Sequence, residues 1–204
     1  FDDSEDTIWV VEGGRLTDVD TAIDVGNAGT VLRFVPPVAA LTAATVEFDG
    51  DEAARRRPVG PLLTALRELG GVIEDSGRGV LPFSVRGAGA MRGGAVRLDA
   101  SSSSQLVSAL LLAGARYDEG VSIEHIGDRP VPNAPHLAMT TAMLRDRGVE
   151  ASAGPTSWSV APGEIDGVDM TIEPDLSSAA PFVAAAVVTA GEVRILDWPV
   201  ASTQ

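Results

Sequence analysis

The chain of 204 residues has no cysteine and no lysine, and its only histidines are His125 and His136. Without cysteine there is no disulfide, no thiolate metal site and no thiol nucleophile. All 15 basic residues are arginine, so the chain has no ammonium group for a Schiff base or for acid–base chemistry. Two histidines argue against a histidine-based metal site. We therefore expect no metal.

Positive charge and long apolar runs are also scarce. The formal net charge of −14 argues against nucleic acid and anionic membrane surfaces as partners. No apolar run approaches the ~20 residues that span a bilayer, and no signal peptide is visible. We therefore expect a cytoplasmic protein. Because the sequence begins at Phe1 without methionine and ends directly after an expected strand, we interpret it as a fragment of a longer protein.

What the chain does have is a run of four serines, Ser101 to Ser104, followed by Gln105. Residues 96–98 before the run read as a strand and residues 106–112 after it as a helix. At such a turn the first helical N–H groups lack partners and the helix dipole is positive, which suits an anion. One serine suffices as a helix cap, so four serines and a glutamine favour an anion site over a cap with spare serines.

The serine turn belongs to a repeat. Asp24, Asp99 and Asp175 recur about every 75 residues, a length that suits a whole supersecondary unit. We expect units at about residues 1–78, 79–155 and 156–204, built as β-α-β-α-β-β, with one full copy, one copy short at its front and one short at its end. The expected first strands, first helices and following strands are residues 21–24, 31–41 and 44–48; 96–98, 106–112 and 121–125; and 170–173, 179–189 and 192–196. Second helices are expected at residues 61–69 and 135–147, each ended by a glycine, Gly70 or Gly148.

The hydrophobic pattern indicates how these elements pack. The first helices are apolar nearly all round, so each is expected to be buried on all sides. The strands alternate in polarity, which gives sheets with one wet face, and His125 is accordingly interpreted as a surface residue. The predicted fold is α/β (α+β), a single inside-out domain over residues 1–204 with pseudo-threefold symmetry, buried helices and outer sheets. Such symmetry gathers the amino ends of the three first helices at one place.

Two further features fit an anionic ligand at that place. The turn from Asn27 to Gly29 lets a backbone amide approach a ligand closely, although small residues there also suit tight helix packing. Residues 55–57 are three consecutive arginines, an ordinary solvated surface run or a guanidinium site for phosphate or carboxylate. Arg57, followed by Pro58, is the arginine we expect to bind the ligand.

Four motifs together resemble the enolpyruvyl transferase family, in the family's order and over nearly the whole chain. They are Asn27–Arg33, Arg57–Gly60, Ser103–Gln105 and Glu173–Ala179. The Ser-Gln motif and residues 132–136 favour the members that act on 3-phosphoshikimate. The alternatives are the members that act on UDP-N-acetylglucosamine, which typically rely on a cysteine absent here, and a non-catalytic repeat domain that serves only assembly.

The resemblance implies a two-domain transferase that uses no cofactor and closes over 3-phosphoshikimate and phosphoenolpyruvate. This chain resembles most of one domain, with the second domain as its partner. The matching motifs imply that Ser103 and Ser104 hold the 3-phosphate of shikimate, with Gln105 between the two substrates. They imply that Arg57 pairs with phosphoenolpyruvate and that the turn at Asn27 and Gly29 lines the same pocket.

The remaining family positions give weaker indications of a role in binding. Arg33 and Asp175 match residues near the family's cleft. Asn133 stands where the family usually has a serine that contacts the shikimate phosphate, and His136 where some members have a tyrosine. The family takes its catalytic lysine and carboxylates from outside the matched region, so we expect this chain alone to position substrates without turnover.

Overall fold

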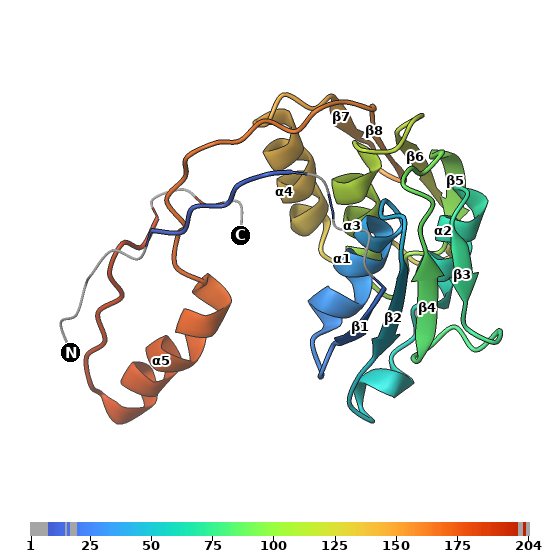
Figure 1. Ribbon diagram of the computed structural model, residues 1–204. Coiled ribbons are helices and arrows are strands. Elements are labelled where there is room, and N and C mark those ends of the chain that lie inside the picture. The colour runs from blue at the N-terminus through green and yellow to red at the C-terminus, as the bar shows by residue number, and fades with distance from the viewer. Residues whose placement is uncertain (1–7, 15, 17–19, 200–201, 203–204) are drawn as a thin grey trace.

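The computed structural model describes residues 8–14, 16, 20–199 and 202 (Figure 1). The first unit consists of β1 (Thr21–Asp24), α1 (Gly29–Ala39), β2 (Thr45–Asp49), the 3-10 helix η1 (Ala54–Arg56), α2 (Gly60–Glu68), β3 (Val72–Glu74) and β4 (Phe83–Arg86). Its sheet has the strand order β1-β2-β4-β3, in which β1 and β2 are parallel and the other pairs antiparallel.

The second unit repeats this plan. It consists of β5 (Gly94–Leu98), α3 (Gln105–Gly114), β6 (Val121–His125), α4 (Ala134–Arg145), β7 (Ala151–Ala153) and β8 (Ser157–Val160). The strand order β5-β6-β8-β7 again has one parallel pair, β5 with β6, and two antiparallel pairs. The predicted β-α-β-α-β-β order is therefore confirmed, and two units are complete where only one was expected to be.

The core lies between the helices and one face of each sheet. Along β2, β6 and β8 buried and exposed residues alternate, so each sheet has one face toward solvent, as predicted. In α3 eight of the ten residues are buried, and this helix packs against α1, α4 and the second sheet. The side chain of Tyr117 is also buried and donates a hydrogen bond to the carbonyl of Pro37 near the end of α1, at 2.8 Å, which ties the second unit to the first.

Glycines end the second helices as predicted. Gly70 and Gly148 have φ of +106° and +77°, a backbone region that costs glycine little. Just after each of them, the N–H of Gly71 bonds the carbonyl of Leu66, and the N–H of Val149 bonds that of Leu144. Each pair closes the last helical turn and frees the chain to start a strand.

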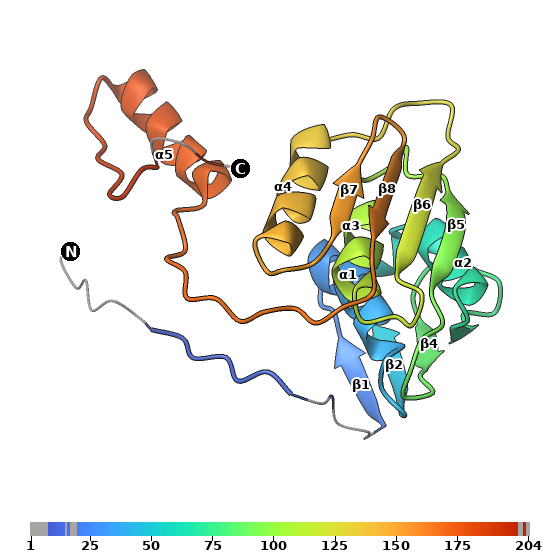
Figure 2. The same cartoon turned by 90° about the horizontal axis from the view of Figure 1, so that it is seen from above.

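The third unit was predicted wrongly. Residues 170–173 and 192–196 form no strand. The helix α5 (Leu176–Thr189) does form, but it has no buried residue, and Figures 1 and 2 show it set apart from the two sheets. A pair of strands by itself is only marginally stable. Among the described residues no sheet packs on α5, and its apolar side chains, such as Val187 and Val188, are exposed.

No helix in the described part of the chain is long and apolar enough to cross a membrane.

The contrast between α3 and α5 predicts unequal effects of truncating an apolar side chain. Leu110 is fully buried, so Leu110→Ala is expected to lower the free energy of unfolding by about 2–5 kcal/mol. Val187 is 77% exposed, so Val187→Ala is expected to change it by less than about 0.5 kcal/mol. Urea unfolding followed by circular dichroism measures both, and equal losses would contradict the described packing.

Candidate anion-binding site

The first turns of α1, α3 and α4 meet at one place. On α3, the Oγ of Ser104 lies 3.2 Å from the Nδ1 of His136 on α4, and the Oε1 of Gln105 accepts a 2.7 Å hydrogen bond from the Nη1 of Arg33 on α1. The ring of Phe34 on α1 lies 6.5 Å from the ring of His136, which closes the triangle. The predicted meeting of the three first helices is therefore only partly right: α1 and α3 meet as expected, but the third helix at this place is α4, and α5 lies elsewhere (Figure 1).

Polar contacts fix the turn before α3. The carboxylate of Asp99 accepts the N–H of Ser101 at 2.9 Å, and the Oγ of Ser103 accepts the N–H of Gln105 at 3.2 Å. Asp24 and Asp175 make similar bonds to the N–H groups of Gly26 and Ser178, which explains why aspartate recurs at these turns.

His125 was wrongly interpreted as a surface residue. It is 9% exposed, its Nδ1 accepts the N–H of Ala100 at 3.2 Å, and its Nε2 donates to the carbonyl of Arg129 at 2.8 Å. It ties the end of β6 to the serine turn and to the loop that leads into α4. The alternating strand pattern indicates only which face of the sheet a residue lies on. It does not show that the ring of His125 has hydrogen-bond partners in two loops.

Two guanidinium groups lie over the start of α1. The Nη1 atoms of Arg57 and Arg33 lie 2.7 and 3.1 Å from the point that a Cβ on Gly29 would occupy. A side chain at this position would displace the two guanidinium groups. Arg33 joins this place to Gln105 on α3, a contact between residues 72 positions apart that no local pattern announces.

Of the three consecutive arginines, only Arg57 lies over the start of α1. Arg55 forms a two-pronged bond with Asp49, at 2.8 and 2.6 Å, and Arg56 pairs with Glu52 at 2.7 Å. Neither Arg57 nor Arg33 has a carboxylate partner among the described residues.

The positive charge at this place is partly desolvated. The Nε of Arg33 is buried, and no described group accepts its hydrogen. Burial, and then the neighbouring charge of Arg57, lower the pKa of the Arg33 guanidinium. Two like charges this close, without a carboxylate, favour an anion between them.

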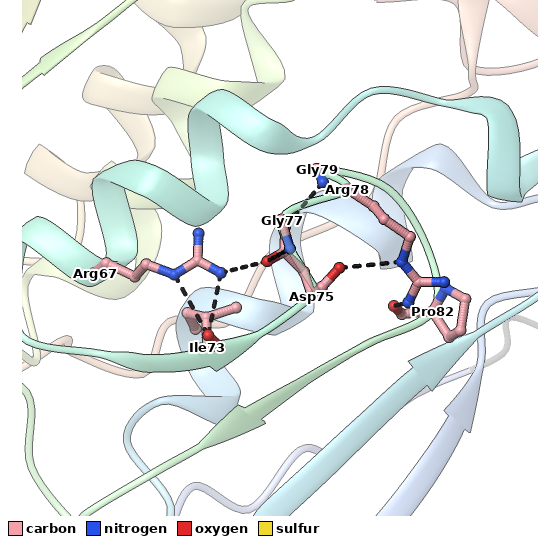
Figure 3. Close-up of polar contacts among 7 residues, drawn as sticks. All are labelled: Arg67, Ile73, Asp75, Gly77, Arg78, Gly79 and Pro82. Atoms are coloured by element: carbon pink, nitrogen blue, oxygen red, sulfur yellow. Dashed lines mark hydrogen bonds and ion pairs between the residues drawn. The ribbon is translucent and has the colours of Figure 1, made fainter.

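A braced turn holds the segment that carries Arg57 (Figure 3). Asp75 is nearly buried, and its carboxylate accepts bonds from Arg67 at 2.7 Å, from the N–H of Gly77 at 3.0 Å and from the N–H of Gly79 at 2.8 Å. The carbonyl of Gly79 in turn accepts the N–H of Val59, two residues after Arg57. The turn therefore fixes where α2 begins and where Arg57 projects.

The other expected site residues lie at the edge or elsewhere. Asn27 is exposed in the turn before α1. Asn133 precedes α4, is exposed, and has a φ of +53°; its carbonyl accepts the N–H of His136 at 2.9 Å. Asp175 caps α5 and accepts bonds from both the N–H and the hydroxyl of Ser178, so the structure places it outside the cluster.

Two surface cavities lie away from this place. A cavity of about 670 Å³ is lined by strands of the first sheet and carries Asp24, Glu47, Asp49, Asp51 and Glu74. Another of about 490 Å³ is lined mainly by strands of the second sheet. The carboxylates of the first would repel an anion. Within the described residues, no group of three or more histidine, aspartate or glutamate side chains is arranged to hold a metal ion.

The starts of α1, α3 and α4, together with Arg57, therefore offer hydroxyl, amide and guanidinium donors. Burial lowers the pKa of His136, so its imidazole is mainly neutral at neutral pH. Such a set binds and orients an anion and stabilises negative charge.

The chain is similar to known proteins of one family. Residues 1–204 match the family model of EPSP synthase (3-phosphoshikimate 1-carboxyvinyltransferase). A 3-phosphoshikimate 1-carboxyvinyltransferase from Kocuria rhizophila is 55% identical over 183 residues, which are 89% of this chain and 41% of that protein. A solved EPSP synthase from Acinetobacter baumannii has 26% identity and a TM-score of 0.66, over 82% of this chain and 36% of the other. The chain thus spans less than half the length of these relatives.

The braced turn predicts a stability effect that depends on pH. Burial raises the pKa of Asp75, but the bonds from Gly79, Gly77 and Arg67 outweigh it and hold the pKa below its ordinary value of 3.8. This carboxylate therefore stabilises the fold above pH 3.8, and its contribution is lost as the pH falls through the lowered value. Asp75→Asn is expected to cost about 2–4 kcal/mol at neutral pH, because the charge is lost and one acceptor oxygen is replaced by an NH2 donor.

Urea unfolding at neutral pH and well below the ordinary carboxyl pKa measures this difference. The gap between wild type and Asp75→Asn is expected to narrow in acid. Asp118→Asn is the matched control, because Asp118 is exposed and the described residues give its carboxylate no bond. A gap that stays constant with pH would contradict the role assigned to the carboxylate.

Proposed function

The chain belongs to the EPSP synthase family, and we propose that the whole protein transfers the enolpyruvyl group of phosphoenolpyruvate to the 5-hydroxyl of 3-phosphoshikimate, with release of phosphate. The observation that carries this proposal is the pair of guanidinium groups over Gly29, beside the hydroxyl of Ser104 and the amide of Gln105. Both substrates are phosphate monoesters, and each also has a carboxylate. Guanidinium forks and hydroxyl donors suit these groups.

We assign the two substrates to the two sides of Gln105. On the side of α4, Ser103, Ser104 and the first turn around Asn133 and His136 take the 3-phosphate of shikimate. The distance of 3.2 Å between Ser104 and His136 supports this grouping.

On the other side of Gln105, Arg57 takes phosphoenolpyruvate, and the exposed turn at Asn27 closes that end. Arg33 holds Gln105 by its side chain and so keeps the two subsites in register.

The reaction adds the 5-hydroxyl oxygen to the enol carbon, with loss of the hydroxyl proton, while the methylene carbon takes a proton and becomes a methyl group. The tetrahedral adduct then expels phosphate as the methyl group gives up a proton, which restores the carbon–carbon double bond. Negative charge stays on the phosphate and carboxylate throughout, where Arg57 and Arg33 stabilise it. The neutral, partly buried His136 is engaged with hydroxyls, and the described site offers no carboxylate base. The acid and the base therefore come from the remainder of the protein.

The exposed helix α5 supports the same conclusion. Phe182, Val187 and Val188 are 65%, 77% and 82% exposed, an apolar surface that needs a partner. We propose that the remainder of the protein covers α5, and that its second domain closes over the two substrates.

Calorimetric titration of the 204-residue chain with 3-phosphoshikimate tests this function. We expect weak binding that Ser104→Ala weakens about tenfold, since one bond to a charged group is lost. Ser102→Ala is the matched control, because Ser102 is exposed in the same run. No heat at millimolar ligand, or preference for UDP-N-acetylglucosamine, would contradict the proposal.

Arginine variants separate the two halves of the site. In the whole protein, Arg57→Ala is expected to raise KM for phosphoenolpyruvate at least tenfold and to leave KM for 3-phosphoshikimate within about threefold. Arg56→Ala should change neither, because Arg56 is exposed and paired with Glu52. Equal effects of the two substitutions would contradict the assignment of Arg57.

Glycine 29 gives a further test on the phosphoenolpyruvate side. In Gly29→Ala the added methyl meets only the flexible ends of Arg57 and Arg33, so we expect stability to change by less than about 1 kcal/mol. The displaced guanidinium groups should raise KM for phosphoenolpyruvate at least tenfold. Steady-state kinetics and urea unfolding of the whole protein measure both, and a large stability loss with unchanged KM would contradict this geometry.

A further inference from the structure

Four polar side chains form a connected chain where α3 packs on α4. The Oγ of Ser108 lies 2.8 Å from the Oγ1 of Thr140 and 3.3 Å from the Nδ1 of His136. The same Nδ1 lies 3.2 Å from the Oγ of Ser104, and the Oγ1 of Thr140 lies 2.8 Å from the carbonyl oxygen of His136. Ser104, Ser108 and Thr140 are all buried, so their hydrogens must be used within this chain or by a ligand.

The direction of each bond follows from the carbonyl. A carbonyl oxygen only accepts, so Thr140 spends its single hydroxyl hydrogen on the carbonyl of His136. Two hydroxyl oxygens at 2.8 Å need a hydrogen between them, and Ser108 must therefore supply it to Thr140. Ser108 then has no hydrogen left for the imidazole.

The hydrogen between Ser108 and His136 must consequently come from the ring. With the hydrogen on Nδ1, the ring donates to the oxygens of both Ser108 and Ser104. With the hydrogen on Nε2, two lone pairs, those of Nδ1 and Ser108, would face each other at 3.3 Å in a buried place. The Nδ1–H form also leaves the hydroxyl hydrogen of Ser104 unused within the chain.

We propose that Thr140 and Ser108 hold His136 as its Nδ1–H tautomer, and that this tautomer turns the hydroxyl of Ser104 into a donor aimed at a phosphate monoester. Thr140 and Ser108 are then positioning residues, which act on the ligand through His136 and Ser104. The identity of the ligand, 3-phosphoshikimate, rests on the proposed function; the tautomer rests on the four distances alone.

The two histidines make the tautomer directly measurable. His125 is predicted in the opposite form, since its Nδ1 accepts the N–H of Ala100 and its Nε2 donates to the carbonyl of Arg129. Nitrogen-15 labelling of histidine in the 204-residue chain gives two ring patterns in a long-range proton–nitrogen correlation spectrum. At a pH where both rings are neutral, we expect one Nδ1–H and one Nε2–H pattern. Two Nε2–H patterns would overturn the proposal.

Thr140→Val supplies the decisive variant. Without the threonine oxygen, the hydrogen of Ser108 is released to the ring, so His136 is expected to switch to the Nε2–H form. Thr140→Ser keeps the oxygen and should restore the wild-type spectrum. Thr141→Val is the matched control, because Thr141 is equally buried on the same helix but donates to the carbonyls of Leu137 and Ala138, away from the ring.

Calorimetry on the same proteins reads out the ligand. Thr140→Val is expected to weaken binding of 3-phosphoshikimate by about tenfold, and the Thr140→Ser and Thr141→Val variants to bind within about threefold of wild type. An unswitched ring or unchanged affinity in folded Thr140→Val would overturn the proposal and leave the proposed function standing. The predicted tautomers with no binding in wild type would contradict the proposed function and, with it, the aim of Ser104 at a phosphate.

Discussion

The packing of α3 against α1 and α4 is the contact on which the rest of the structure depends. An apolar helix buried on nearly all sides has to be enclosed by other helices and by a sheet, and that enclosure brings the first turns of three helices to one place. The polar residues at those turns then face one another as a consequence of core packing. Core and site are thus built by the same helices, and the site inherits its rigidity from the core.

The positive charge at the site comes from arginines that have no carboxylate beside them among the residues that the structure describes, while the neighbouring arginines are paired with carboxylates. The chain carries a formal net charge of −14, yet Arg33 and Arg57 lie together without a carboxylate partner in the described part of the chain. The adjacent arginines Arg55 and Arg56 are neutralised by Asp49 and Glu52. An anionic ligand is therefore attracted to the two guanidinium groups and repelled by the acidic surface around them. The larger cavity, which is lined by carboxylates, is part of that acidic surface.

The sequence patterns correctly predicted those elements that depend mainly on residues close together in the chain. Alternation and apolar periodicity gave both sheets and their helices, the terminating glycines Gly70 and Gly148 were placed correctly, and the serine turn was recognised before α3. What failed depends on distant partners. The strands around α5 were expected from their alternating sequences. A strand forms only where neighbouring strands pair with it in a sheet. His125 was assigned to the surface because its partners Ala100 and Arg129 lie in loops.

The central claim is that the starts of α1, α3 and α4 form one site for a phosphorylated ligand. A crystal structure of the chain with 3-phosphoshikimate tests it most directly. The account predicts phosphate oxygens within hydrogen-bonding distance of the Ser104 hydroxyl, on the side of Gln105 that faces α4. A ligand seated in a cavity on either sheet, with Ser104 untouched, would contradict it.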